Sequence, residues 1–108
     1  MDTLELQRRQ QLALDAIKQS FGTAAASDSV DLFIEHHLEA LPAGYWLQQL
    51  GTETPEPSAV LGLLLFSGAW GENDMEYFDF TLPGEVTQYV VSVCFDQAGK
   101  IGSISMES

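Results

Sequence analysis

With 108 residues, the chain has the length of one domain and is too short for two hydrophobic cores. Apolar residues make up 45% and charged residues 19%, which is typical of a globular rather than a disordered chain. The formal net charge of −12 argues against partners that need Lys and Arg contacts, so we expect no nucleic acid and no membrane among them.

The negative charge is concentrated after the first 20 residues. Arg8, Arg9 and Lys18 balance three acids in that first segment, whereas Lys100 is the only lysine or arginine in the rest of the chain. A strongly acidic surface increases solubility and also speeds association with basic partners. Both interpretations remain open from the sequence.

Cys94 is the only cysteine, so the chain cannot form an internal disulfide. It lies between apolar residues with no neighbouring cation, which predicts a small strand residue rather than a reactive thiolate. The N-terminus lacks a secretory signal pattern, and the most apolar run, Ala59 to Phe66, is far shorter than the roughly 20 residues of a membrane helix. We therefore expect a cytoplasmic protein.

The first predicted element is a helix that begins near Asp2 and ends at Gly22. Asp2 and Glu5 have the spacing of a capping box. Apolar residues then recur at helical spacing and make one stripe, from which Leu4 and Leu12 deviate. The stripe consists of Leu6, Ala13, Leu14, Ile17 and Phe21.

A short polar connection leads to a second helix, which Asp28 or Ser29 can cap. Its apolar positions follow the i, i+3, i+4 pattern until Pro42 ends the run. These positions are Val30, Phe33, Ile34, His37, Leu38 and Leu41. A short third helix is expected over Ala43–Leu50, ending at Gly51.

The periodicity changes after Thr52–Ser58, a loop with two prolines. We interpret this change as the junction of a helical half, residues 1–51, and a strand half, residues 59–108, within one domain. Val60–Phe66 is apolar on both faces and predicts a central strand covered on both sides. Gly68–Asp74 has the glycines, Asn and acids of a hairpin turn.

Alternation of apolar and polar residues predicts a half-buried strand over residues 77–82 and another over residues 88–95. One face of the second strand carries Tyr89, Val91, Val93 and Phe95, and the other carries Gln88, Val90, Ser92 and Cys94. Pro83-Gly84 suits a type II turn, and Asp96 to Gly99 suits a type I turn before a last strand over Ile101–Met106. The predicted fold class is α+β, with two or three N-terminal helices packed on one face of a four-stranded antiparallel meander sheet.

Several short motifs in the strand half resemble those of a known family. They are Phe78-Asp79-Phe80, residues 85–89, Phe95-Asp96 with Gly99, and the closing Met106-Glu107-Ser108. In these residues the chain resembles a bacterial family of small acidic proteins of unknown function, and the His36-His37 helix matches less closely. The resemblance implies an α+β fold and a bacterial source, and it implies no catalytic residues.

Two adjacent histidines, His36 and His37, are the first candidates for a metal site. Neighbouring helical side chains point about 100° apart, so the two rings do not readily share one ion. His36 and Glu39 could supply two ligands, whereas a structural zinc site normally needs four. We therefore expect no metal, and we interpret His37 as a core histidine with one or two hydrogen bonds.

Motifs for catalysis or cofactor binding are absent from the sequence. There is no G-x-S-x-G elbow, no base placed near Cys94, and no phosphate loop or dinucleotide fingerprint. Glu72, Asp74, Glu76 and Asp79 lack the regular ligand spacing of an EF-hand. We expect no catalytic residue and no cofactor, and therefore not an enzyme.

Acidic residues recur where stability alone does not favour them. Like charges four residues apart on a helix cost a few tenths of a kcal/mol, and the acids near residue 74 have no cation nearby in the sequence. Either high solubility or a basic partner explains this pattern. The candidate partner-binding residues are Asp31, Glu35 and Glu39 on the second helix and Glu72, Asp74 and Glu76 in the turn.

The preferred hypothesis is a binding module that docks a basic protein, as an immunity or antidote protein does, with Trp70 or Tyr77 as buried anchors. The alternative is a small-molecule or metal-responsive protein whose site is assembled from residues distant in sequence. A third hypothesis is a homo-oligomer joined through strand edges or through Leu4 and Leu12.

Overall fold

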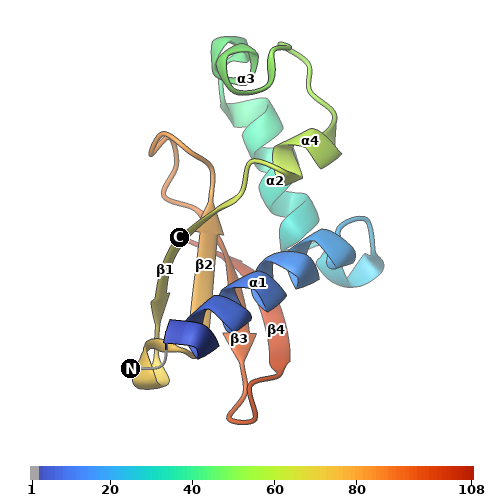
Figure 1. The fold of residues 1–108 in the computed structure, drawn as a ribbon. Helices are drawn as coiled ribbons and strands as arrows, with labels where there is room; N and C mark the ends of the chain where they lie inside the picture. The colour runs from blue at the N-terminus through green and yellow to red at the C-terminus, as the bar shows by residue number, and fades with distance from the viewer. Residues whose placement is uncertain (1–2) are drawn as a thin grey trace.

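The computed structural model describes residues 3–108 and confirms an α+β fold (Figure 1). Within this range four α-helices precede a four-stranded antiparallel sheet of order β1-β2-β3-β4. The helices are α1 (Thr3–Ser20), α2 (Val30–Ala40), α3 (Ala43–Leu50) and α4 (Pro57–Leu61). The strands are β1 (Leu65–Trp70), β2 (Tyr77–Thr81), β3 (Val90–Phe95) and β4 (Ile101–Glu107). Short 3₁₀ turns are η1 (Ala24–Ala26) and η2 (Glu72–Asp74).

The first two helices form where the periodicity predicts them, and α3 forms between Pro42 and Gly51, as expected from its end at Gly51. Gly22 follows α1 with a φ of +84°, and Gly51 follows α3 with a φ of +73°, so both predicted helix ends are confirmed. The predicted side-chain cap of α2 is wrong, because Ser29 occupies the N-cap position without a capping hydrogen bond from its side chain. The predicted capping box at Asp2 lies outside the described residues.

The predicted central strand over Val60–Phe66 is wrong. Its first residues belong to the short helix α4, and the strand begins only at Leu65 and lies at an edge of the sheet. Pro57 occupies the start of α4, where its missing N–H removes no helical hydrogen bond. A short apolar run fits a buried helical turn as well as a buried strand, so periodicity does not separate the two. The turn predicted from Gly68 therefore begins later, after Trp70.

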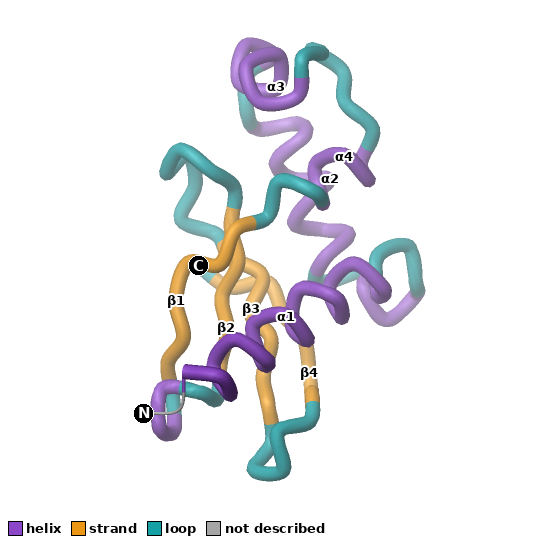
Figure 2. Tube along the Cα trace, viewed as in Figure 1, coloured by secondary structure: helices purple, strands orange, loops and turns teal. Residues whose placement is uncertain are grey.

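Alternation along β2 and β3 places one side of the sheet in the core. Phe78 lies opposite Val93, and Phe80 lies opposite Val91, and all four side chains are buried. Helix α1 runs across this side and contacts β2, while α2 contacts β3 and β4 (Figure 2). Helices α3 and α4 lie beyond one end of the strands (Figure 1).

The turns between the later strands have the predicted geometry. Gly84 has a φ of +91°, as the second central residue of a type II turn requires. Gly99 donates its backbone N–H to the Asp96 carbonyl at 3.0 Å and has a φ of +79°. The β2–β3 loop is anchored to α3, because the Tyr45 hydroxyl donates to the Pro83 carbonyl at 2.7 Å.

Across residues 3–108, none of the helices combines the length and the apolar character that a membrane span requires. Leu4 and Leu12 are 78% and 39% exposed, which confirms that they lie off the buried stripe of α1.

Candidate functional site

The acidic ridge of α2, defined as Asp31, Glu35 and Glu39, is divided between two roles. The Asp31 carboxylate accepts a hydrogen bond from the Gly22 backbone N–H at 3.0 Å and so joins the start of α2 to the end of α1. Glu35 and Glu39 are exposed, and no hydrogen bond or ion pair of their side chains is found within residues 3–108. Glu35 and Glu39 are therefore the ridge residues that are available to a partner.

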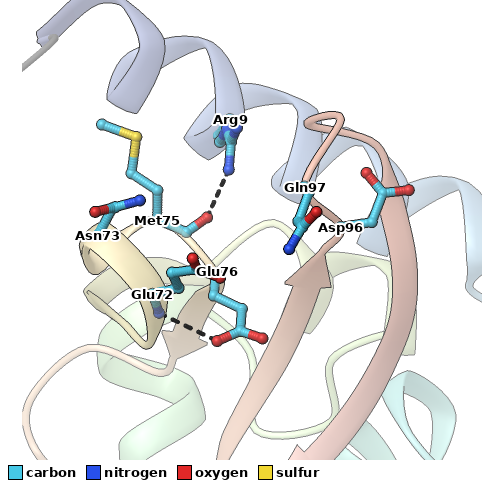
Figure 3. A pocket seen from close by; sticks show the side chains of 7 residues that line it. All are labelled: Arg9, Glu72, Asn73, Met75, Glu76, Asp96 and Gln97. Carbon is cyan, nitrogen blue, oxygen red and sulfur yellow. Dashed lines mark hydrogen bonds between the residues drawn. The ribbon is translucent and has the colours of Figure 1, made fainter.

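The acidic turn, defined as Glu72, Asp74 and Glu76, follows β1, and two of its residues, Glu72 and Glu76, line a pocket of about 320 Å³ (Figure 3). Glu76 is structural, because its carboxylate accepts the Glu72 backbone N–H at 3.1 Å. Arg9 reaches this turn from α1 and donates to the Met75 carbonyl at 2.8 Å. The acids therefore have a cation nearby in space, although the sequence places none near them.

The acidic ridge and the acidic turn are separate surfaces. Helix α2 packs against β3 and β4, whereas the acidic turn contacts β1 at the opposite edge of the sheet. The structure therefore does not bring the six predicted residues into one site.

Ion pairing in the described part of the chain is limited to Glu5. The carboxylate of Glu5 binds both Arg8 and Arg9, and Arg8 lies 2.7 Å from it. Hydrogen bonds from Arg8 and then Arg9 lower the pKa of Glu5 to about 2. Two of the four Lys and Arg side chains are thus engaged by one acid of α1, and neither is paired with a residue of the acidic ridge.

His37 is confirmed as a core histidine. Its Nδ1–H donates to the Phe33 carbonyl at 2.6 Å, and its Nε2 lies 2.8 Å from the Thr87 hydroxyl, which donates to the neutral ring. Burial lowers the pKa of His37 and outweighs the opposing effect of the Phe33 carbonyl, and the neighbouring His36 lowers it further. The ring links α2 to the β2–β3 loop through these two hydrogen bonds.

His36 points outward and makes an edge contact with Tyr89, with ring centroids 5.2 Å apart. No group of three or more His, Cys, Asp or Glu side chains suited to a metal ion occurs within residues 3–108. The pair His36 and Glu39 accordingly gains no third ligand there.

A further candidate lies on the open face of the sheet, the face directed away from the buried phenylalanines of β2. The rings of Trp70 and Tyr77 stack there with centroids 4.1 Å apart and planes 15° apart. Trp70 is 49% exposed, so the expectation that it is buried is wrong. Next to this pair, Asp79 lies opposite Ser92, and Ser92 lies opposite Ser105. Together these side chains line a groove of about 480 Å³, here called the open-face groove.

Two buried oxygens at the open-face groove lack a hydrogen-bond partner among residues 3–108: Asp79 Oδ1 and Ser92 Oγ. The other carboxylate oxygen, Asp79 Oδ2, accepts the indole N–H of Trp70 at 2.9 Å. Ser92 is only 3% exposed. An unsatisfied buried polar group costs about 1–3 kcal/mol, so these two oxygens require an explanation.

The surroundings of Tyr77 disfavour the ionised form of its hydroxyl and so raise its pKa. The adjacent Cys94 thiol, followed by the carboxylates of Glu76 and Glu107, raises the pKa of the Tyr77 hydroxyl. Cys94 itself is a half-buried residue of β3 on the same face, as predicted for a small strand residue.

The alternation of β2 and β3 indicates which residues face away from the core, and Tyr77, Asp79 and Ser92 are among them. The sequence does not specify the register that sets Asp79 beside Ser92. Comparison of the chain with protein-family models, with curated proteins and with solved structures found no match.

Proposed function

We propose that this chain is a small acidic binding module of the cytoplasm that docks a basic protein, in the manner of an immunity or antidote protein. The observation that carries the proposal is the distribution of charge. Arg8 and Arg9 are both engaged by Glu5, while the exposed Glu35 and Glu39 have no ion pair within residues 3–108. A basic partner supplies the missing positive charge and accelerates encounter.

The surface beside the acidic ridge also offers apolar contact. Leu32 is 43% exposed, and together with Asp28, His36 and Tyr89 it lines a groove of about 350 Å³ between α2 and the end of β4. Charged pairs at a rim mainly set association rate and salt dependence, and buried apolar side chains supply much of the affinity. Leu32 is the apolar anchor in this proposal.

The experiment is affinity capture of basic proteins from a lysate of the source cells, at roughly 50 mM and roughly 500 mM salt. The test variant is Glu35→Lys with Glu39→Lys. The matched control is Glu53→Lys with Glu56→Lys, which changes the net charge equally at two exposed positions of the α3–α4 loop.

We expect a basic protein that is retained at low salt by the parent chain and by the control variant, and lost at high salt. The test variant should not retain it at either salt, because lysines at these positions repel a basic surface. Equal retention by the two variants would contradict a contact at the acidic ridge, since only the overall charge would then matter.

A further inference from the structure

We propose that the open-face groove binds the guanidinium group of an arginine, between the Trp70 ring and the Asp79 carboxylate. The inference deepens the proposed function and rests on it for the source of the arginine, which is the basic partner. The binding chemistry itself is argued from the groove alone.

The first argument is the unmet need for hydrogen-bond donors at the floor of the groove. A carboxylate oxygen only accepts hydrogen bonds, so the unpartnered Asp79 Oδ1 requires a donor. The Ser92 hydroxyl oxygen lies on the neighbouring strand directly opposite Asp79 and accepts from the same side. A ligand that fits this pair presents two or more N–H groups in one plane.

The second argument is the charge of the lining. The side chains that line the groove include the carboxylates of Asp79 and Glu107, and the described lining contains no Lys, Arg or His. Two carboxylates without a balancing cation favour a positively charged ligand and disfavour an anion. A guanidinium is such a cation and carries five N–H donors and no acceptor.

The third argument is the aromatic wall. The half-exposed Trp70 ring is stacked on Tyr77, which holds it roughly parallel to that ring. A planar guanidinium stacks on an indole face and is attracted by its quadrupole. An ammonium group lacks the planar fork, so it stacks less well and forms no paired hydrogen bonds.

Space for the ligand exists beside Asp79. Gly68 lies opposite Asp79 on β1, and a Cβ added to Gly68 meets no atom within 4 Å. Four residues lie side by side across the strands at this level: Gly68, Asp79, Ser92 and Ser105. Because glycine has no side chain, the space above β1 in this row is open. The groove volume of about 480 Å³ falls in the range of about 300–1,000 Å³ that small-ligand sites occupy.

Binding competes with one existing hydrogen bond. The Trp70 indole N–H already donates to Asp79 Oδ2, and both unpartnered oxygens have almost no exposed area. A guanidinium that reaches them takes the place of the indole N–H as the donor to Asp79, while the Trp70 ring stays stacked on Tyr77. The Trp70 indole resonance is therefore a direct reporter of occupancy, and Trp46, which is 2% exposed in the core, supplies an internal reference.

The test uses a probe that contains the guanidinium without a charged backbone, N-acetyl-arginine-N-methylamide. We expect it to shift the Trp70 indole N–H resonance in a saturable way and to leave the Trp46 resonance unchanged. The matched neutral probe, N-acetyl-citrulline-N-methylamide, and the lysine analogue should bind at least about tenfold more weakly, because the first lacks charge and the second lacks the planar fork.

Two variants test the floor of the groove. Asp79→Asn keeps an oxygen that accepts the Trp70 indole N–H but replaces the second acceptor, and should weaken probe binding about tenfold. Ser92→Ala should weaken probe binding several-fold and should also raise the melting temperature, because it removes a buried unsatisfied hydroxyl. Asp15→Asn, at an exposed carboxylate of α1, is the control and should change neither measurement.

The opposite outcomes overturn the inference. It fails if the arginine probe gives no saturable shift, or if the citrulline or lysine probe binds equally well. Unchanged binding by both Asp79→Asn and Ser92→Ala overturns it as well, since the probe would then bind elsewhere. Because no partner protein is present in this experiment, its failure leaves the capture result at Glu35 and Glu39 intact, and failure of the capture leaves the probe result intact.

Discussion

Replacement of Gly71 by alanine should destabilise the turn that separates β1 from β2. Gly71 has a φ of +89° and a ψ of −154°, a region of backbone conformation that is accessible almost only to glycine. An added Cβ would lie 2.6 Å from Glu76 Oε1, 2.7 Å from Glu76 Cβ and 2.9 Å from Tyr77 Cδ2. The substitution therefore forces both a backbone change and a displacement of the Glu76 side chain.

The expected loss in the free energy of unfolding follows from these two effects. Holding a side chain in such a backbone region costs about 1–3 kcal/mol. Displacing the Glu76 carboxylate breaks its hydrogen bond to the Glu72 N–H, which is exposed and so worth only about 1 kcal/mol. We expect Gly71→Ala to lower the free energy of unfolding by about 2–4 kcal/mol, a large share of the roughly 5–15 kcal/mol typical of a domain.

Urea denaturation followed by far-UV circular dichroism measures this change. The control is Gly44→Ala on α3, where an added Cβ meets no atom within 4 Å, and which should gain up to about 1 kcal/mol. In a Glu76→Ala background the effect of Gly71→Ala should fall by about 1 kcal/mol, because the hydrogen bond is already absent. A loss below about 0.5 kcal/mol for Gly71→Ala would refute the reasoning.

Three further predictions concern the core and the β2–β3 loop. The lowered pKa of His37 means that the folded state binds fewer protons than the unfolded state, so its contribution to stability is present above the usual histidine pKa of 6.5 and is lost as the pH falls below that value. His37→Gln should reduce the difference between the free energies of unfolding measured by urea titration at about pH 7.5 and about pH 5.5. An unchanged difference would contradict this role of His37. Tyr45→Phe removes the hydrogen bond to the Pro83 carbonyl and should cost about 0.5–1.5 kcal/mol in thermal unfolding, whereas a neutral result would mean that the loop is held by other contacts. Phe78→Ala, at a fully buried position, should cost about 3–5 kcal/mol by denaturation, and a loss under about 1 kcal/mol would place Phe78 outside the core.

The Gly71 prediction also affects how the acidic residues are tested. Glu76 caps the turn through its carboxylate, and Asp31 holds the Gly22 N–H, so substitutions at either residue alter the fold as well as the charge. Glu35 and Glu39 make no such contact within residues 3–108, so charge reversal there changes stability by only a few tenths of a kcal/mol and reports mainly on binding.

Local signals in the sequence predicted much of the fold. Helical periodicity predicted α1 and α2, and the stop at Gly51 predicted α3. Glycines with positive φ follow α1 at Gly22 and α3 at Gly51. Strict alternation identified β2 and β3 and their buried sides. These predictions are correct because each depends on residues within a few positions of one another, and backbone geometry fixes the side-chain directions over so short a distance.

Other features were decided only by tertiary structure. The apolar run after Pro57 divides between a helix and an edge strand according to what it packs against, and Arg9 meets the Met75 carbonyl only because α1 crosses the sheet. Strand register brings Asp79 beside Ser92 and leaves two oxygens without partners among the described residues. Residues so far apart in the chain meet through long-range packing, and no local pattern specifies which of them become neighbours.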